Sequence, residues 1–263
     1  MKHVKKKFIR SRGLSEAEGT ILDSVSATEE TLGTIVQRGG DEYVAILLTT
    51  GQQLVQAFMY QHEGNVYPVP EANPIVLYFE IARHNVRDLN PVRRDLLASV
   101  VGQEANVIVA NNKFYGFYAR AAGAVIFMHT ALEAFMNFVI PKTFTYSRSK
   151  PRHTEVFDCS QIQRFIPCEE KLDKVMSAVF AKSFALDHPA EYKRLLRLLE
   201  LRNNLIHTKA LVKGPRSIYE ALYTEALDFD YYAALKAVRA FLNYHSPSLI
   251  EDCDCDREDG VQE

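Results

Sequence analysis

Apolar residues in this chain recur at helical spacing over long runs, which polar or proline-containing breaks separate. The pattern is clearest in five segments, where apolar side chains return every three or four residues: 75–89, 117–140, 168–184, 189–201 and 231–242. Glycine and proline lie mainly between these runs, where helices begin and end. The pattern predicts an all-α protein built as a helical bundle.

The first part of the chain also fits helices. Ser15-Glu16-Ala17-Glu18 is a capping-box pattern that would open a helix ending near Gly39-Gly40. A second helix with apolar residues at near-helical spacing would follow, and then a proline-containing loop: Val44, Leu47, Leu48, Val55 and Phe58, then Pro68, Pro70 and Pro74. Asn90 and Pro91 resemble the N-cap and first residue of a further helix. The β-branched residues 107–109 leave two alternatives open, a short strand or a helix that continues from Pro91.

These patterns predict three regions. We expect a helical N-terminal region over residues 1–115 and a helical domain over residues 116–246. From Ser246 the chain turns acidic, and we expect residues 247–263 to form a disordered tail.

The composition narrows the classes of function. Of the 263 residues, 47% are hydrophobic, which is ordinary for a globular protein. The formal net charge of -2 shows none of the basic surplus that is typical of proteins that coat nucleic acid. No signal peptide and no apolar run near about 18 residues is evident, so we expect a cytoplasmic protein without membrane contact. Cys253-Asp254-Cys255 has no His or Cys partners at metal-site spacing, and no phosphate-binding glycine loop is present. We expect no metal and no cofactor.

The densest chemistry lies in Leu199-Glu200-Leu201-Arg202-Asn203-Asn204-Leu205-Ile206-His207, at the end of an apolar helical run. Arg202 can hold a phosphate oxygen with two parallel hydrogen bonds. His207 can exchange protons near neutral pH, and Asn203 can orient either side chain. These groups suit the cleavage of a phosphodiester without a metal.

A structural interpretation of the same residues stays open. They could be the solvated end of an amphipathic helix, in which His207 caps a carbonyl. On a regular helix Arg202 and His207 lie about 140° apart, because each residue turns about 100°. Arg202 would therefore have to reach around the helix, or a partner chain would have to supply half of the site.

The order Arg202-Asn203…His207 resembles the signature of HEPN-domain proteins, many of which are RNA-cutting toxins and defence nucleases. Upstream, Ala131-Leu132-Glu133-Ala134-Phe135-Met136-Asn137 is similar to the Leu-Glu-Ala-Phe-x-Asn pattern of their first core helix. Between the two motifs a helix would begin after Pro167 with an apolar stripe of Leu172, Val175, Met176, Val179 and Phe180. The resemblance covers residues 116–246 and implies a HEPN-like domain of four or five helices that usually forms a homodimer.

The resemblance also implies roles for single residues. Arg202 would stabilise the charge that develops on phosphorus, His207 would act as general acid or base, and Asn203 takes the small polar position. Glu133 matches the acidic residue of the first helix, and it would either support the chemistry or form a structural tie to Arg202. Toxins paired with nucleotidyltransferase antitoxins have a Tyr two residues after the His, where this chain has Thr208-Lys209, so that mechanism is not supported.

A basic cluster follows the first HEPN-like helix. Tyr146 could stack on a base, and three cationic side chains could contact phosphates: Arg148, Lys150 and Arg152. The alternative is a solvated arm without a binding role.

These inferences predict a metal-independent endoribonuclease of the HEPN type in toxin, phage-defence or stress biology. It would act on RNA as a homodimer with a shared site, and an antitoxin or other regulatory protein would be a possible partner. A non-catalytic HEPN-like module that binds RNA or a protein is the alternative. A purely structural protein, in which the motif is a helix end, is a third interpretation.

Overall fold

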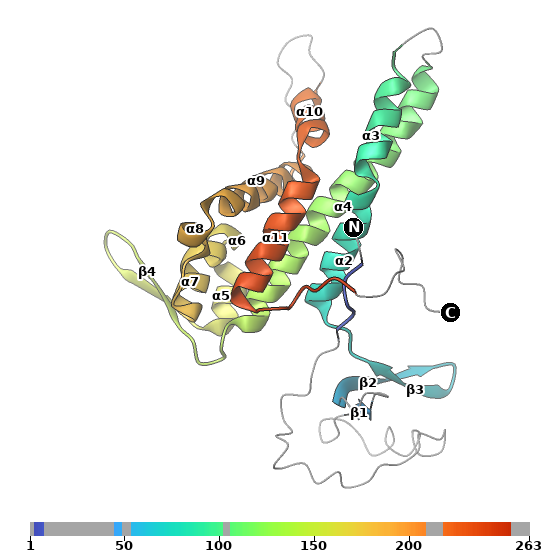
Figure 1. Ribbon diagram of the computed structural model, residues 1–263. Coiled ribbons are helices and arrows are strands. Elements are labelled where there is room, and N and C mark those ends of the chain that lie inside the picture. The colour runs from blue at the N-terminus through green and yellow to red at the C-terminus, as the bar shows by residue number, and fades with distance from the viewer. Residues whose placement is uncertain (1–2, 8–44, 49–53, 102–105, 209–217, 254–263) are drawn as a thin grey trace. The chain divides into compact units, whose positions relative to one another are not determined.

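The computed structural model describes residues 3–7, 45–48, 54–101, 106–208 and 218–253. The chain divides into two units, one of residues 6–73 and one of residues 1–5 with 74–263. Figure 1 labels the elements of both units.

The smaller unit contains an antiparallel sheet of order β1-β2-β3: β1 (Ala45–Leu48), β2 (Leu54–His62) and β3 (Asn65–Pro70). A two-residue turn joins β2 to β3, with positive φ at Glu63 (49°) and Gly64 (83°). Positive φ at both central residues is typical of the tight turns whose twist matches that of the flanking strands.

The helix expected over Leu47, Leu48, Val55 and Phe58 is therefore wrong, because these residues lie in strands. Short apolar runs fit either period, and pairing with distant residues decides between them. The prolines expected in a loop, Pro68 and Pro70, are in β3. This strand lies at the edge of the described sheet, where a residue without an N–H is tolerated. The helix expected from Ser15 lies outside the described residues.

The larger unit is mainly helical, as the pattern predicted, but the chain is not all-α, because this unit also contains a two-stranded hairpin and the smaller unit contains a sheet. Its elements in chain order are α2 (Pro74–Arg87), α3 (Leu89–Ala98), α4 (Val107–Val139), the hairpin β4 (Tyr146–Ser149) and β5 (Thr154–Phe157), α5 (Cys159–Phe165), α6 (Cys168–Glu170), the π-helical η2 (Lys171–Val175), α7 (Met176–Phe180), α8 (Phe184–Asp187), α9 (Pro189–Ile206), α10 (Glu220–Asp228) and α11 (Tyr231–His245). Because α2 and α3 pack against α4, this helical unit begins at Pro74 and not after residue 115.

The core of this unit is built around α4, which contacts α2, α3, α9 and α11 (Figure 1). Its buried side chains include Phe117, Ala121, Ala124, Val125, Met128, Leu132, Phe135 and Met136. Small residues let α2 approach closely, and a Cβ added to Gly123 would lie 3.2 Å from the Nδ2 atom of Asn85. Each large apolar side chain buried in this way contributes about 1.5–3 kcal/mol to folding.

By length and composition α4 could cross a membrane, which corrects the expectation that no apolar run is long enough. These two properties alone do not separate a membrane helix from the core helix of a globular unit. In this structure the middle of α4 is covered by other helices.

Two predicted helix boundaries shift. The helix expected over residues 168–184 ends at Phe180, because Ala181 has the left-handed φ of 53°, and α8 begins separately at Phe184. Its expected apolar stripe is confirmed, with Leu172, Val175 and Met176 fully buried. Residues 107–109 form neither a strand nor a continuation of the helix that contains Pro91, which ends at Ala98. They are the first turn of α4, which the Asn106 side chain caps by accepting from two backbone N–H groups.

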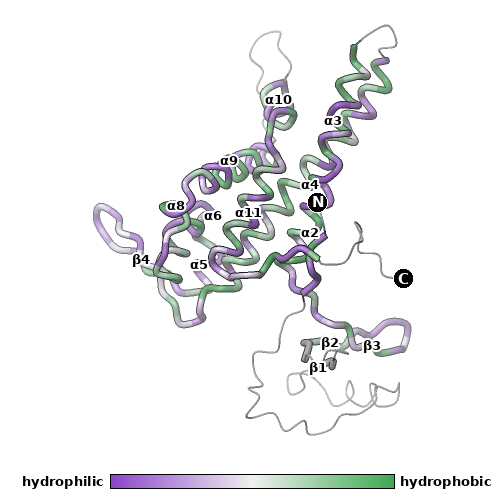
Figure 2. The backbone as a smooth tube through the Cα atoms, viewed as in Figure 1, coloured by the Kyte–Doolittle hydropathy of each residue, from purple (hydrophilic) through white to green (hydrophobic). Residues whose placement is uncertain are grey.

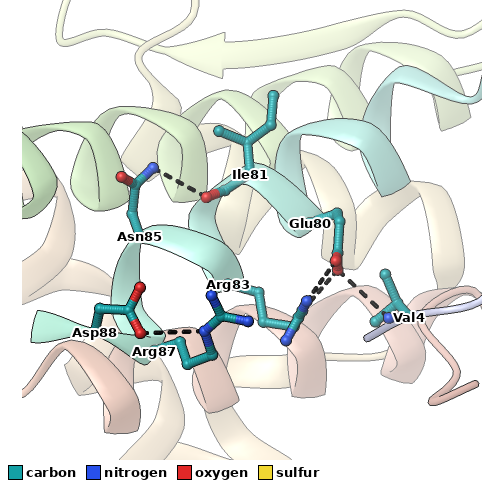
Figure 3. A network of polar contacts seen from close by, with 7 residues as sticks. All are labelled: Val4, Glu80, Ile81, Arg83, Asn85, Arg87 and Asp88. Atoms are coloured by element: carbon teal, nitrogen blue, oxygen red, sulfur yellow. Dashed lines mark hydrogen bonds and ion pairs between the residues drawn. The ribbon is translucent and has the colours of Figure 1, made fainter. Parts of the chain in front are cut away.

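The described ends of the chain pair with each other. Val4 and Asp252 form an antiparallel bridge, and Ile250 is fully buried. The Val4 N–H also donates to Glu80 at 3.4 Å, and Glu80 accepts two bonds from Arg83 at 2.6 and 2.7 Å (Figure 3). The expectation of disorder from Ser246 is therefore wrong for residues 246–253, and residues 254–263 lie outside the described chain.

His245, the last residue of α11, lies in an aromatic box formed by Phe135, Phe180, Phe241 and Tyr244. Neither ring nitrogen has a hydrogen-bond partner among the described residues. Burial, with a smaller contribution from Lys182, lowers the pKa of His245 to about 4. The ring is therefore neutral in the folded protein at neutral pH.

This burial predicts acid sensitivity. Between pH 6.5 and about 4, His245 becomes protonated in the unfolded chain but stays neutral in the folded chain. The free energy of unfolding therefore falls by up to about 3 kcal/mol as the pH is lowered through this range. We expect His245→Phe to remove this part of the pH dependence in urea unfolding measured across that range. His84→Phe, at an exposed histidine of α2, is the control and should leave the pH dependence of unfolding as it is in wild type. The same slope in wild type and His245→Phe would contradict the account.

Candidate functional site

The predicted motif lies at the last turn of α9. Pro189 begins this helix, and its apolar face is buried through Leu195, Leu198, Leu199 and Leu201. The helix then becomes polar and exposed, and His207 is its C-cap residue, whose backbone N–H donates to the Asn203 carbonyl at 2.9 Å. The motif thus begins beside the core and ends in solvent.

Arg202 is half-buried between these two environments. Its Nη1 donates to the Oδ1 atom of Asn203 at 3.1 Å. Its Nε is buried and has no hydrogen-bond partner among the described residues. A buried donor without a partner costs about 1–3 kcal/mol, so Arg202 retains capacity for an acceptor that comes from elsewhere.

Arg202 lies close enough to α4 and α6 to act on two titratable groups there. Burial lowers the pKa of His129, and the positive charge of Arg202 is the next largest cause. Burial also raises the pKa of the Cys168 thiol to about 12, and nearby Glu133 raises it further, while Lys171 and Arg202 oppose this. Cys168 is therefore a neutral thiol and no nucleophile at neutral pH.

Glu133 does not form the expected tie to Arg202 in the ion pairs of the described chain. Its Oε1 lies 3.4 Å from the Nζ of Lys171, and its Oε2 lies 3.8 Å from the Nδ1 of His129. Lys171 is 1% exposed, and it also donates to Asn137 Oδ1 at 3.2 Å and to the Gln163 carbonyl at 3.0 Å. We name His129, Glu133, Lys171 and Arg202 the charge cluster.

Sequence reasoning missed Lys171. His129 and Asn137 precede and follow Glu133 by four residues on α4, so their common stripe was visible in the sequence. Lys171 comes from a distant helix and looks like an ordinary solvated lysine between two glutamates and an apolar stripe. It begins the π-helical segment η2, a distortion of helices that is frequent at functional sites.

Arg202 and His207 are not joined to each other. No hydrogen bond between their side chains occurs in the described part of the chain, and His207 is exposed. One copy of the chain therefore brings Asn203 next to Arg202, which belongs to the charge cluster. It leaves His207 at the surface, without a side-chain hydrogen bond to Arg202.

The predicted RNA-contact residues lie in the hairpin β4–β5, where the sequence indicated a loop. Tyr146 is buried and its hydroxyl donates to Glu170 at 2.7 Å. Burial, and after it this hydrogen bond, raises the pKa of Tyr146 to about 12. Arg148 binds both oxygens of Glu170 through its Nε and Nη2 atoms. Tyr146 and Arg148 therefore hold the hairpin to α6, which corrects their assignment as residues free to stack or to bind phosphate. Lys150 and Arg152 remain exposed at its turn.

No group of three His, Cys, Asp or Glu side chains with metal-binding spacing occurs among the residues that the structure describes. Searches against protein-family models, curated proteins and solved structures find no match for this chain.

The burial of Lys171 predicts a large effect on stability. Lys171→Met would leave Glu133, Asn137 and the Gln163 carbonyl without their common donor, so we expect the free energy of unfolding to fall by about 2–4 kcal/mol. Urea unfolding measures this change. Lys174→Met, three residues further along η2 at an exposed site, is the matched control and should change stability by less than about 0.5 kcal/mol. Equal effects of the two substitutions would contradict the role of Lys171.

Proposed function

We propose that this chain is a metal-independent endoribonuclease of the HEPN type, in which Arg202, Asn203 and His207 act on one phosphodiester of RNA. The observation that carries this proposal is the buried Nε of Arg202, which has no partner among the described residues. It lies in a half-buried guanidinium whose other end meets Asn203, one of the two other residues of the motif.

The electrostatics of the charge cluster support an anionic ligand. The charged groups that act on His129 are two cations, Arg202 and Lys171, and one carboxylate, Glu133. Lys171 is already bound to Glu133, which leaves the charge of Arg202 without a carboxylate partner among the ion pairs of the described chain. A phosphodiester would supply both the missing charge and an acceptor for the Nε atom.

The proposed reaction is a transesterification of RNA. The 2′-hydroxyl attacks the adjacent phosphorus and loses its proton to a base, and the bond from phosphorus to the 5′-oxygen breaks as that oxygen gains a proton. The products are a 2′,3′-cyclic phosphate and a 5′-hydroxyl. Arg202 would stabilise the negative charge of the pentacovalent transition state.

His207 suits the proton transfer better than His129. Burial and Arg202 lower the pKa of His129, and its ring lies inside the helical unit. His207 is exposed at the helix end, where a backbone as bulky as RNA can reach it.

We further propose that the site is shared between two copies of the chain. In one copy the side chains of Arg202 and His207 are not joined, and a twofold arrangement would place Arg202 of one protomer near His207 of its partner. We place the activity in toxin or defence biology, where an antitoxin or other regulatory protein would restrain it.

Substitution of His207 tests the chemistry. We expect His207→Ala to slow cleavage of RNA by about 10²–10⁴-fold without loss of folding, because a positioned acid or base contributes a factor of this size. Arg202→Lys keeps the charge but loses the planar fork, and it should also cut poorly. The measurement is the rate at which ends with a 2′,3′-cyclic phosphate appear in the presence of a chelator.

Two controls make this test specific. His84→Ala removes an exposed histidine of α2, and Arg197→Lys changes an exposed arginine of α9 that precedes Arg202 by five residues. Both should cut at the wild-type rate. If purified wild type binds RNA and cuts nothing, the chain is a non-catalytic module. If His207→Ala cuts as fast as wild type, His207 has no part in the chemistry.

Mixing two inactive variants tests the shared site. If Arg202 of one protomer works with His207 of its partner, a dimer of Arg202→Ala and His207→Ala chains contains one intact site. Equal mixing after subunit exchange should then restore on the order of a quarter of wild-type activity, since half of the dimers are mixed and each has one of two sites. Mixed dimers that form and remain inactive would show that both residues act within one chain.

A further inference from the structure

Large apolar side chains gather where α3 ends and α4 begins, away from the core of the helical unit. Six of them are between 42 and 85% exposed, and we name this set the apolar tip: Leu97, Val100, Val101, Val107, Ile108 and Val109. Figure 1 shows α3 and the first part of α4 side by side and extending beyond the packed helices, and Figure 2 shows the hydrophobic colour at their ends, beyond a stretch in which it alternates with the hydrophilic colour.

The position of the tip is fixed by pairing between the two helices. The Asn106 N–H donates to the Ser99 carbonyl at 3.4 Å, and Lys113 bonds to Asp95 at 2.8 Å. In α4 the continuous burial begins only at Phe117, with Ala110 the one buried residue before it. The first ten residues of this helix therefore contribute little to the core, although Val107, Ile108 and Val109 at its start are strongly apolar.

Basic side chains lie directly behind the apolar tip. Over residues 87–120 the sequence has five basic and three acidic side chains, although the chain as a whole has a net charge of -2. Arg94 is exposed one turn before Leu97, and Lys113 follows Val109 by four residues, which is about 6 Å along a helix. Tyr115 is 69% exposed half a turn further on.

We propose that the apolar tip inserts into the surface of a lipid bilayer that contains anionic lipids. Apolar side chains of a peripheral protein insert into such a surface to a depth of about 5–10 Å, and aromatic and basic residues lie at the level of the headgroups. Along α4 the side chains follow the same order, with apolar Ile108 first and then Lys113 and Tyr115. The excess of basic residues behind the tip matches the negative charge of the lipid. This proposal replaces the expectation of no membrane contact and is independent of the proposed nuclease activity.

A single tryptophan can report the insertion, because the chain contains none. We expect the full-length Ile108→Trp protein to show a blue-shifted emission on addition of vesicles of phosphatidylcholine and phosphatidylserine, and quenching when the lipid tails are brominated. Leu186→Trp, at an 81% exposed apolar residue of α8, is the matched control and should show neither change. No shift for Ile108→Trp, or equal shifts for both proteins, would overturn the proposal.

Charge substitutions separate the two parts of the interaction. Ile108→Glu should weaken sedimentation with these vesicles by about tenfold or more. Arg94→Glu should weaken it by about fivefold or more, and only when phosphatidylserine is present. Leu186→Glu should bind as wild type does. If Ile108→Glu instead converts a dimer to a monomer in solution and vesicle binding is absent in wild type, the tip is an interface between copies of the chain and the lipid proposal is wrong.

Discussion

The burial of the apolar middle of α4 is the constraint on which the rest of the helical unit depends. Four other helices gain their core contacts by packing against it, and its side chains from Phe117 to Met136 form the centre of the hydrophobic core. Because this packing fixes the position of α4, it also fixes the positions of His129 and Glu133, the polar residues along the same stretch. The part of α4 before Phe117 lies outside this constraint and is mostly exposed.

The charge cluster is a consequence of this packing. Folding buries Lys171 against α4, where a lysine is stable only with acceptors around it, and Glu133, Asn137 and the Gln163 carbonyl supply them. Glu133 is thereby engaged on the side of Lys171 and is not paired with Arg202. The guanidinium of Arg202 is left beside a fixed arrangement of charges with an unused donor, which is the property that the proposed function uses.

The helices α2, α9 and α11 could be predicted from the sequence because their apolar residues follow one period over many turns. The strands β1 and β2 could not, because their apolar runs are short and near-helical in spacing, and pairing across the sheet decided their structure. Pro68 and Pro70 indicated a loop because the sequence does not show which strand lies at an edge. Boundaries set by one backbone conformation, such as the left-handed Ala181, were also hidden.

For the candidate site, the sequence showed the residues that are close along the chain. Arg202, Asn203 and His207 share one helix end, as their spacing indicates. The partners of Glu133 and Tyr146 were not visible, because Lys171 and Glu170 reach them from other elements. The polar character of Tyr146 and Arg148 indicated a surface that binds RNA, whereas their contacts within the chain are what hold the hairpin.

The most direct test of the account is a measurement on the Nε–H group of Arg202 itself. Its NMR resonance, assigned by comparison with Arg202→Lys, can be followed while an RNA oligonucleotide with 2′-deoxy substitution, which lacks the attacking hydroxyl, is added. The account predicts that this resonance shifts and becomes protected from exchange with water, because a phosphate oxygen accepts a hydrogen bond from the Nε–H group. A resonance that stays unchanged while the RNA binds elsewhere on the protein would contradict it.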